Sequence, residues 1–384
     1  MSELTSIKKW FWWHRWSSLI CTLFLLMLCL TGLPLIFTEE LTHALSNDPP
    51  YTVVPKNTPL RSFNELSNAA RQLYPGHAIS SIYLDEHEPQ VWLSMIPGIK
   101  DDPKFTHTIQ FDARTGAVRK DNLAENVAPK TFMDMMFNLH VDMFMGLPGE
   151  LFLGVMGLLF VISIISGVVL YGPFMKKLDF GEIRKHRSSR LKWLDLHNLL
   201  GIATAVWLLV VGATGVFNDL STPLFGLWQM TDVKTMLDSY KGKTTPNAAE
   251  LAPVQEAFEV AQKTLPTMKV VSIVYPGNIY GSPYHYLFWA QGNTPLTSRL
   301  YSPILVDARS GKLDKVLEMP FYLRALEVSR PLHFGDYGGM PLKVLWALFD
   351  VMAIMVLIGG VYLWMVRRKF YKNYFERLSN EETA

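Results

Sequence analysis

The sequence predicts an integral membrane α-helical bundle of four transmembrane helices that carries two α+β domains outside the membrane. Hydrophobic residues make up 49% of the 384 residues and charged residues only 18%, a composition that favours a membrane protein. Internal similarity further predicts a duplication whose halves are related by a pseudo-two-fold axis along the membrane normal. Four apolar runs are long enough to cross a bilayer: residues 19–37, 151–171, 198–217 and 344–366.

Each half of the chain has the same order: a histidine-bearing apolar helix, a polar globular stretch, a histidine-bearing connector and a second apolar helix. Residues match between the halves at three places. These are His14 and Thr31-Gly32 with His197 and Thr214-Gly215; Leu139-His140 and Gly167 with Leu332-His333 and Gly360; and FDARTG at 111–116 with VDARSG at 306–311. The four repeat-matched histidines are therefore the candidate functional residues.

The distribution of Lys and Arg predicts the orientation of the helices. The loop 172–192 and the C-terminal tail are rich in these residues, whereas residues 38–55, 131–150 and 218–233 contain none. By the positive-inside rule, both termini and the 172–192 loop lie in the cytoplasm, which predicts a multi-pass membrane protein. The first apolar run is longer than a signal-peptide core and no small-x-small cleavage site follows it, so we expect a retained anchor.

This topology divides the chain into eight predicted segments. In order they are residues 1–38 (cytoplasmic start and first transmembrane helix), 39–130 (first periplasmic domain), 131–172 (periplasmic histidine connector and second helix), 173–192 (cytoplasmic basic loop), 193–217 (third helix), 218–324 (second periplasmic domain), 325–366 (periplasmic histidine connector and fourth helix) and 367–384 (cytoplasmic tail).

Both periplasmic segments are too long for loops and have the patterning of small folded domains, with a helix followed by strands. The predicted helix and first two strands are 63–73, 79–84 and 91–95 in the first domain, and 254–266, 270–275 and 284–290 in the second. Each domain then contains an Asp-Ala-Arg-x-Gly sequence. This is a hairpin-turn signature in which Gly116 and Gly311 can take a positive φ.

Two such units flanked by four membrane helices resemble the PepSY-associated transmembrane family, and the likeness covers nearly the whole chain. It is carried by the matched histidine ahead of Thr-Gly, the Leu-His ahead of Gly-x-Pro and the Asp-Ala-Arg-x-Gly turns. Within the family, the chain is most similar to inner-membrane ferric-siderophore reductases. The resemblance implies PepSY-like domains, b-type haem, and reduction of iron at the periplasmic face, but these motifs do not identify the siderophore.

Topology sorts the four matched histidines into two levels. His14 and His197 start helices at the cytoplasmic edge, and His140 and His333 precede helices at the periplasmic edge. Two-fold symmetry pairs His14 with His197 and His140 with His333. Two facing imidazoles on bundle helices are a natural axial pair for haem iron, so we expect two b-type haems. The other histidines have no repeat partner and are predicted to be surface residues: His43, His77, His87, His107, His186 and His285.

Other interpretations of these residues stay open. A lone histidine near a membrane boundary is more often hydrogen-bonded than metal-bound, although four matched positions favour ligation. Zinc and non-haem iron need further protein ligands, and the carboxylates that flank His140, Asp134 and Asp142, are not both duplicated. Nearby methionines could replace a ligand but suit flexible packing: Met133, Met135, Met136, Met143 and Met145. Small residues would let helices or a flat macrocycle approach closely: Gly32, Gly154, Gly157, Gly167, Gly201, Gly215, Gly359 and Gly360.

Asp350 is an acidic residue well inside the fourth apolar run, where a carboxylate is costly and therefore a functional candidate. It could hydrogen-bond to a ligand histidine, serve a proton path, or be a neutral carboxyl bonded to the backbone. The two cysteines, Cys21 and Cys29, lie on one helix too far apart for a disulfide, and we expect both to be buried apolar side chains.

These features favour a haem-dependent ferric-siderophore reductase. Electrons would enter at the His14/His197 haem, pass to the His140/His333 haem and reduce siderophore-bound Fe(III). Because the chain has no G-x-G-x-x-G or P-loop sequence, the electrons must come from a partner, either a cytoplasmic or a quinone donor. Membrane lipid is expected as a partner, and a net charge of +2 gives no reason to expect nucleic acid.

Two alternative functions differ in kind from a reductase. The chain could be a membrane-anchored PepSY peptide-binding or regulatory protein without redox activity. It could also be a permease, although four helices with few internal polar residues leave little for a transport path.

Overall fold

The computed structural model describes residues 3–45, 51–55, 57–85, 88–98, 106–123, 131–175, 179–184 and 188–382. The chain forms two compact units. The membrane unit comprises residues 1–44, 130–222 and 329–384, and the sheet unit comprises residues 45–129 and 223–328. Some residues used to predict topology or surface position lie outside the described residues: Lys176, Lys177, Lys185, Arg187, His87 and His186.

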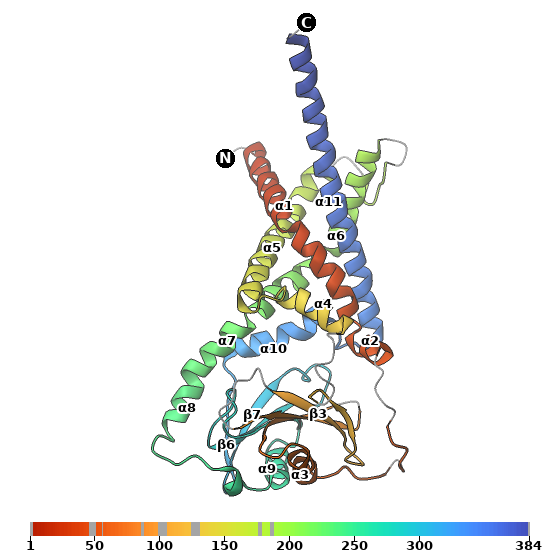
Figure 1. Cartoon of the computed structure of the whole chain (residues 1–384). Helices are drawn as coiled ribbons and strands as arrows, with labels where there is room; N and C mark the ends of the chain where they lie inside the picture. Colours follow the sequence, from red (N-terminus) through yellow and green to blue (C-terminus); the bar gives the residue numbers. More distant parts are fainter. Residues whose placement is uncertain are drawn as a thin grey trace. The chain divides into compact units, whose positions relative to one another are not determined.

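The membrane unit is built on four helices that are long and apolar enough to cross a bilayer, which confirms the predicted number (Figure 1). They are α1 (Glu3–Leu35), α5 (Leu147–Met175), α6 (Ser189–Asp219) and α11 (Gly339–Glu382). Helix α1 packs against α5 and α11, and α6 packs against the same two helices. Helices α1 and α6 therefore occupy opposite corners of a four-helix bundle.

The helices extend beyond their apolar runs, and this corrects the predicted helix starts. Because α1 begins at Glu3 and α6 at Ser189, His14 and His197 lie roughly two to three turns inside their helices. Hydropathy alone does not identify these first turns as helical, because they contain charged residues. Lys, Leu and Trp are nevertheless compatible with a helix, whether inside or outside the hydrocarbon core of the membrane. Both histidines consequently lie within candidate membrane spans.

Three shorter helices accompany the bundle: α2 (Thr38–Leu45), α4 (Phe132–Val141) and α10 (Phe321–Phe334). Helix α4 starts at a capping box, in which the Thr131 hydroxyl accepts the Asp134 N–H and the Asp134 carboxylate accepts the Thr131 N–H. The predicted histidine connectors are thus helical, and His140 and His333 lie in the last turns of α4 and α10. Helix α2 is held to α11 by Lys343, whose ammonium lies 2.8 Å from Glu40.

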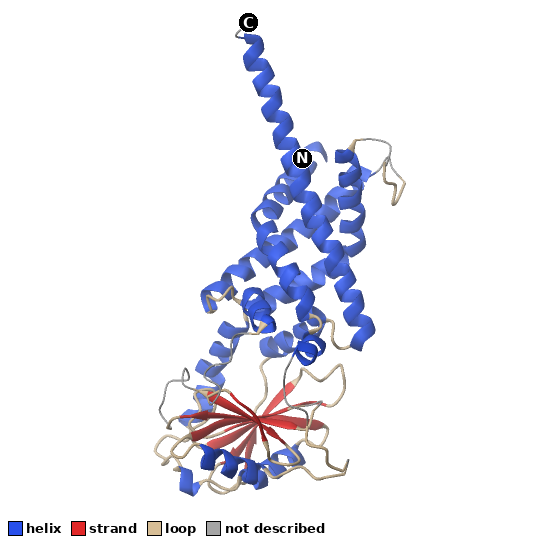
Figure 2. Cartoon of the chain, turned by 45° about the vertical axis from the view of Figure 1, so that its right-hand side comes forward, coloured by secondary structure: helices blue, strands red, loops and turns tan. Residues whose placement is uncertain are grey.

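The sheet unit contains one eight-stranded antiparallel sheet in the order β4-β3-β2-β1-β5-β6-β7-β8 (Figure 2). Its strands are β1 (Ala78–Leu84), β2 (Gln90–Ile96), β3 (His107–Asp112), β4 (Val118–Asp121), β5 (Met268–Val274), β6 (His285–Gly292), β7 (Tyr301–Asp307) and β8 (Leu313–Val316). From either edge of the sheet inward, the fourth, third, second and first strands of one half follow each other in the same order. The two halves meet at the β1–β5 pair, where Ile82 pairs with Ile273. Strands that the sequence assigns to two domains therefore share one sheet.

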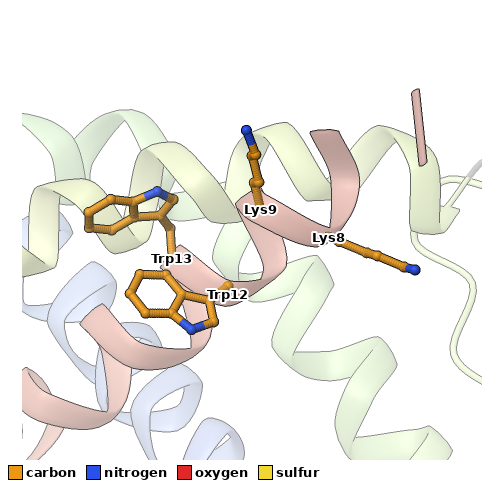
Figure 3. Close-up of a pocket in the computed structure, with 4 residues that line it drawn as sticks. All are labelled: Lys8, Lys9, Trp12 and Trp13. Carbon is orange, nitrogen blue, oxygen red and sulfur yellow. The ribbon is translucent and has the colours of Figure 1, made fainter. Parts of the chain in front are cut away.

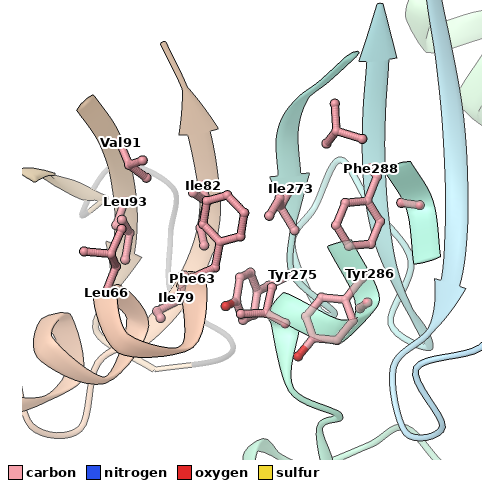
Figure 4. Close-up of a cluster of buried hydrophobic side chains, with 14 of the residues drawn as sticks. Phe63, Leu66, Ile79, Ile82, Val91, Leu93, Ile273, Tyr275, Tyr286 and Phe288 are labelled. Atoms are coloured by element: carbon pink, nitrogen blue, oxygen red, sulfur yellow. The ribbon is translucent and has the colours of Figure 1, made fainter. Parts of the chain in front are cut away.

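One face of the sheet is covered by α3 (Phe63–Leu73) and α9 (Val254–Thr264), the two helices that the sequence predicts in these domains. Their first turns are capped reciprocally, since the Phe63 N–H donates to Gln255 Oε1 and the Gln255 N–H donates to Asn64 Oδ1. Figure 4 shows the shared core, to which Ile82 of β1 and Ile273 of β5 contribute together with aromatic rings from both halves.

The remaining described elements of this region are short. They are α7 (Ser221–Trp228), a π-helical turn (Gln229–Val233), α8 (Lys234–Asp238) and a 3₁₀ turn (Ala248–Glu250). The Asp-Ala-Arg-x-Gly sequences form the predicted turns. The Asp112 carboxylate accepts the N–H groups of Arg114 and Thr115, and Gly116 and Gly311 have φ values of 75° and 66°.

Two histidines predicted at the surface are buried, which corrects that prediction. His107 is 3% exposed and accepts or donates through Nε2 to His77 Nδ1 at 2.9 Å. His285 is fully buried, with Ser282 Oγ 2.7 Å from Nδ1 and Asp314 3.4 Å from Nε2. Each histidine is the first residue of a strand. Its burial depends on polar partners, and a comparison of the two halves of the sequence does not identify these partners.

We expect Ile82→Ala to loosen both halves of the sheet together. Removing this fully buried side chain at the β1–β5 junction costs about 2–5 kcal/mol. Amide hydrogen exchange in the full-length protein should therefore quicken in β5 as well as β1. The matched control is Tyr83→Ala, because Tyr83 is the next residue on the same strand and is 49% exposed. Exchange confined to β1 would contradict a shared sheet.

Candidate metal centre: two facing histidine pairs

The membrane unit brings the four repeat-matched histidines together as two pairs. The imidazole centroids of His14 on α1 and His197 on α6 are 6.3 Å apart, with the ring planes inclined at 67°. The centroids of His140 on α4 and His333 on α10 are also 6.3 Å apart, at 63°. These are the pairs that the symmetry argument predicts, and the two pairs have the same separation.

Each imidazole is anchored through Nδ1 to a backbone carbonyl of a neighbouring helix. The partners are Ser163 O for His14 (2.9 Å), Val356 O for His197 (2.9 Å), Leu28 O for His140 (3.1 Å) and Val211 O for His333 (3.0 Å). A carbonyl can only accept, so Nδ1 carries the proton and Nε2 keeps its lone pair. Histidines that ligate metals are typically oriented by such a bond.

Two threonines reinforce the anchoring of the His140/His333 pair. Thr31 Oγ1 lies 3.0 Å from His140 Nδ1, and Thr214 Oγ1 lies 3.3 Å from His333 Nδ1. Each hydroxyl donates to a carbonyl of its own helix, so it accepts from the imidazole. The sequence identified these threonines only as markers of the repeat. Their role could have been suspected because both are matched and immediately precede a matched glycine.

Every imidazole also packs against a glycine, which explains half of the glycines singled out in the sequence. An added Cβ would lie 3.1 Å from His140 Cε1 at Gly32, 3.1 Å from His14 Cε1 at Gly167, 3.3 Å from His333 Cε1 at Gly215 and 3.5 Å from His197 Cε1 at Gly360. A side chain at the first three positions would press on the ring, so glycine provides the space in which the imidazole is held.

The separation of the rings fits a single iron bound between each pair. A bond between a metal and an imidazole nitrogen is about 2 Å long. Ring bonds of about 1.3 Å place each nitrogen roughly 1.1 Å from its ring centre. Two imidazoles on opposite sides of one metal therefore have centroids about 6.2 Å apart, close to the 6.3 Å of both pairs. The residues present fit the axial ligation of haem.

The protonation state of the His140/His333 pair is also suited to metal ligation. Desolvation lowers the pKa of His140 to about 4, and the facing His333 adds to this effect. Desolvation also lowers the pKa of His333. Both imidazoles are therefore neutral at physiological pH, which is the form that binds a metal.

The described residues contain no cluster of three or more His, Cys, Asp or Glu side chains arranged to hold a metal. The carboxylates beside His140 are used for backbone capping instead, since Asp134 caps α4 and Asp142 accepts the N–H groups of Phe144 and Gly146. A haem would need only two ligands from the protein, and the two histidines of each pair would hold it.

The two pairs lie at different depths of the bundle. On α1 and on α6, 17 residues separate the first-pair histidine from the threonine that contacts the second pair, which corresponds to about 25 Å of helix. Aromatic side chains fill part of the interval. The ring of Trp207 packs against Trp346 at 6.3 Å and Phe349 at 5.7 Å, and Trp346 Nε1 donates to the carbonyl of His333.

Asp350 lies on α11 and is 6% exposed. The thiol of Cys29 on α1 is a polar neighbour of this carboxyl, and Oδ2 has no hydrogen-bond partner in the described part of the chain. No hydrogen bond joins Asp350 to any of the four paired histidines within those residues.

The chain belongs to the family described as the PepSY-associated TM region, whose profile matches residues 11–367. It is therefore a multi-pass membrane protein of that family. It is also similar to the uncharacterized protein PA4219 of Pseudomonas aeruginosa, with 26% identity over 270 residues. That match covers 62% of this chain and 64% of the relative's length.

We expect the glycines beside the imidazoles to control occupancy of the pairs. Gly32→Ala and Gly167→Ala each place a Cβ 3.1 Å from a ring and should displace His140 or His14. The haem content that we propose below, measured per chain by absorption and metal analysis, should decrease in both variants and less in Gly360→Ala. Gly201→Ala is the matched control, since nothing lies within 4 Å of its added Cβ. Equal losses in all four variants would contradict the proposed packing.

Proposed function

We propose that the protein is a di-haem b reductase of the bacterial inner membrane, which passes electrons across the bilayer to a periplasmic ferric siderophore and releases Fe(II) for uptake. The observation that carries this proposal is the pair of matched imidazole sites. In each, both Nδ1 atoms are bound to carbonyls and the rings are 6.3 Å apart. Membership of a PepSY-associated membrane family supports it.

In this proposal His14 and His197 hold one haem, and His140 and His333 hold the other. Bound haem would supply a centre that carries one electron at a time at each depth. The chain's own residues orient the ligands: the carbonyls fix the imidazole protons, Thr31 strengthens the anchoring, and Gly32 leaves space for the ring. The same arrangement occurs in both halves, which supports an internal duplication with its axis along the membrane normal.

The distribution of basic residues predicts the orientation of the chain in the membrane, and this orientation sets the direction of the proposed electron flow. Lys and Arg in the 172–192 loop and the tail favour cytoplasmic termini, with segments 39–130 and 218–324 as PepSY-like parts in the periplasm. The His14/His197 haem is then on the cytoplasmic side and the His140/His333 haem on the periplasmic side. A cytoplasmic or quinone donor would serve the first, and the siderophore would meet the second.

The chemistry of the substrate suits a one-electron reductase. Siderophores bind Fe(III) through hard oxygen donors, and these hold Fe(II) far less tightly. Transfer of one electron therefore releases the metal without breaking a covalent bond of the siderophore. Asp350, buried between the depths of the two pairs, is a candidate for moving a proton alongside the electron.

Spectra of histidine variants test the pairing. His14→Ala and His197→Ala should each remove one haem component from the dithionite-reduced spectrum, and His140→Ala and His333→Ala should remove the other. His43→Ala is the control, because His43 is exposed on α2. If His14→Ala and His140→Ala abolish the same component, the pairing is wrong. A haem-to-protein ratio near zero in the wild-type protein would favour a PepSY regulatory protein instead.

Reoxidation in right-side-out membranes tests the direction. Reduced protein should be reoxidised by added ferric siderophore, since this polar complex reaches only the periplasmic side. His140→Ala or His333→Ala should slow that step far more than Asp350→Asn, which leaves both imidazole pairs intact. An unchanged reoxidation rate after loss of the periplasmic haem would show that the siderophore takes its electron elsewhere.

A further inference from the structure

An open cavity of about 420 Å³ lies along the segment of α1 that precedes His14. Its lining comprises two indoles, an aliphatic side chain, an ammonium group and a hydroxyl: Trp10, Trp13, Ile162, Lys9 and Ser6. A smaller cavity of about 340 Å³ adjoins it, lined by Lys8, Lys9, Trp12 and Trp13 (Figure 3). The two cavities share Lys9 and Trp13, but Ser6, Trp10 and Ile162 belong only to the larger one.

The larger cavity continues the face of α1 that carries His14. Ser6, Trp10 and His14 are spaced four residues apart, so their side chains lie one above another on the helix. Trp10 is thus one turn, about 5.4 Å, from His14. The opposite side of the cavity is lined by Ile162 of α5. The next residue on that helix is Ser163, whose carbonyl accepts the Nδ1–H of His14. A molecule in this cavity would therefore lie about one helical turn before His14 along α1.

The lining suits a flat, apolar ring that carries oxygen atoms. Indole rings stack on planar molecules, and the Lys9 ammonium and Ser6 hydroxyl can hydrogen-bond to carbonyl or hydroxyl oxygens. The volume falls in the usual range for small-molecule sites. Residues 6–35 form a candidate membrane span, so a lipid-soluble molecule can approach α1 from the bilayer. No nucleotide-binding fingerprint occurs in the chain to suggest a tightly bound soluble reductant.

We propose that this cavity binds a membrane quinol, which is the electron donor for the His14/His197 site. The inference rests on the proposed reductase function. Oxidation of one quinol breaks its two O–H bonds, yields the quinone, and releases two protons to the adjoining water. Its two electrons reduce two molecules of ferric siderophore to the ferrous state. Trp10 and Trp13 hold the ring, and Lys9 and Ser6 bind its oxygens.

An anionic phospholipid headgroup is the competing occupant. It would be held by Lys8 and Lys9 alike and would not depend on Trp10, which lines only the larger cavity. The matched pairs Trp10 with Trp12 and Lys9 with Lys8 therefore separate the two occupants. Each pair has the same chemistry on the same helical segment and differs in whether it lines the larger cavity.

The test uses the full-length protein in phosphatidylcholine nanodiscs, with decylubiquinone as the probe. Its affinity is measured by competition with a photoreactive azido-quinone, whose attachment site is mapped by mass spectrometry. Labelling should fall on the segment of α1 before His14. Trp10→Leu and Lys9→Gln should each weaken decylubiquinone binding about fivefold to tenfold, while Trp12→Leu and Lys8→Gln leave it within about twofold.

Haem content of the same samples separates this inference from the proposed function. A wild-type protein without haem would overturn the reductase proposal itself. A haem-loaded protein in which Trp10→Leu binds the probe as well as Trp12→Leu does would overturn the quinol site alone. Displacement of the quinone by phosphatidylglycerol would overturn it too. Lys9→Gln provides an independent outcome should Trp10→Leu fail to fold.

Discussion

The hydrogen bond from each imidazole Nδ1 to a carbonyl of a neighbouring helix is the interaction on which the site depends. In every case the carbonyl belongs to a different helix from the histidine. An imidazole therefore keeps its proton on Nδ1, and the lone pair on Nε2, only while two helices stay packed together. Packing of the helices therefore also orients the four imidazoles. The glycines that contact the rings leave the space that this packing requires.

The same two helices serve both depths of the membrane unit. Helix α1 carries His14 near one end and holds His140 through Leu28, Thr31 and Gly32 near the other. Helix α6 does the same for His197 and His333. Each pair takes one histidine from each half of the chain, as the sheet takes four strands from each half. Neither half alone can form a pair or the complete sheet.

Much of this architecture could be predicted from the sequence because its signals are local or repeated. Apolar runs revealed the four spans, helical spacing revealed residues 63–73, and matching positions singled out the paired histidines. The single sheet could not be predicted, since pairing of Ile82 with Ile273 joins strands far apart in the chain and leaves no pattern in either.

The details of the site were beyond the sequence for related reasons. A threonine in an apolar helix usually bonds to its own backbone, and only the structure shows that Thr31 also faces an imidazole. The burial of His107 and His285 depends on partners from other strands or turns, which a comparison of the halves does not pair. Helix starts were misplaced because the first turns of α1 and α6 lie outside the apolar runs.

The proposed ligation of iron by the facing imidazoles can be tested directly by pulsed electron-nuclear double resonance on oxidised protein labelled with ¹⁵N-histidine. Two low-spin ferric haem centres are expected, each coupled to two histidine nitrogens, one from each half of the chain. A centre with a single histidine nitrogen, or one with none, would contradict the assignment of the two pairs as axial ligands.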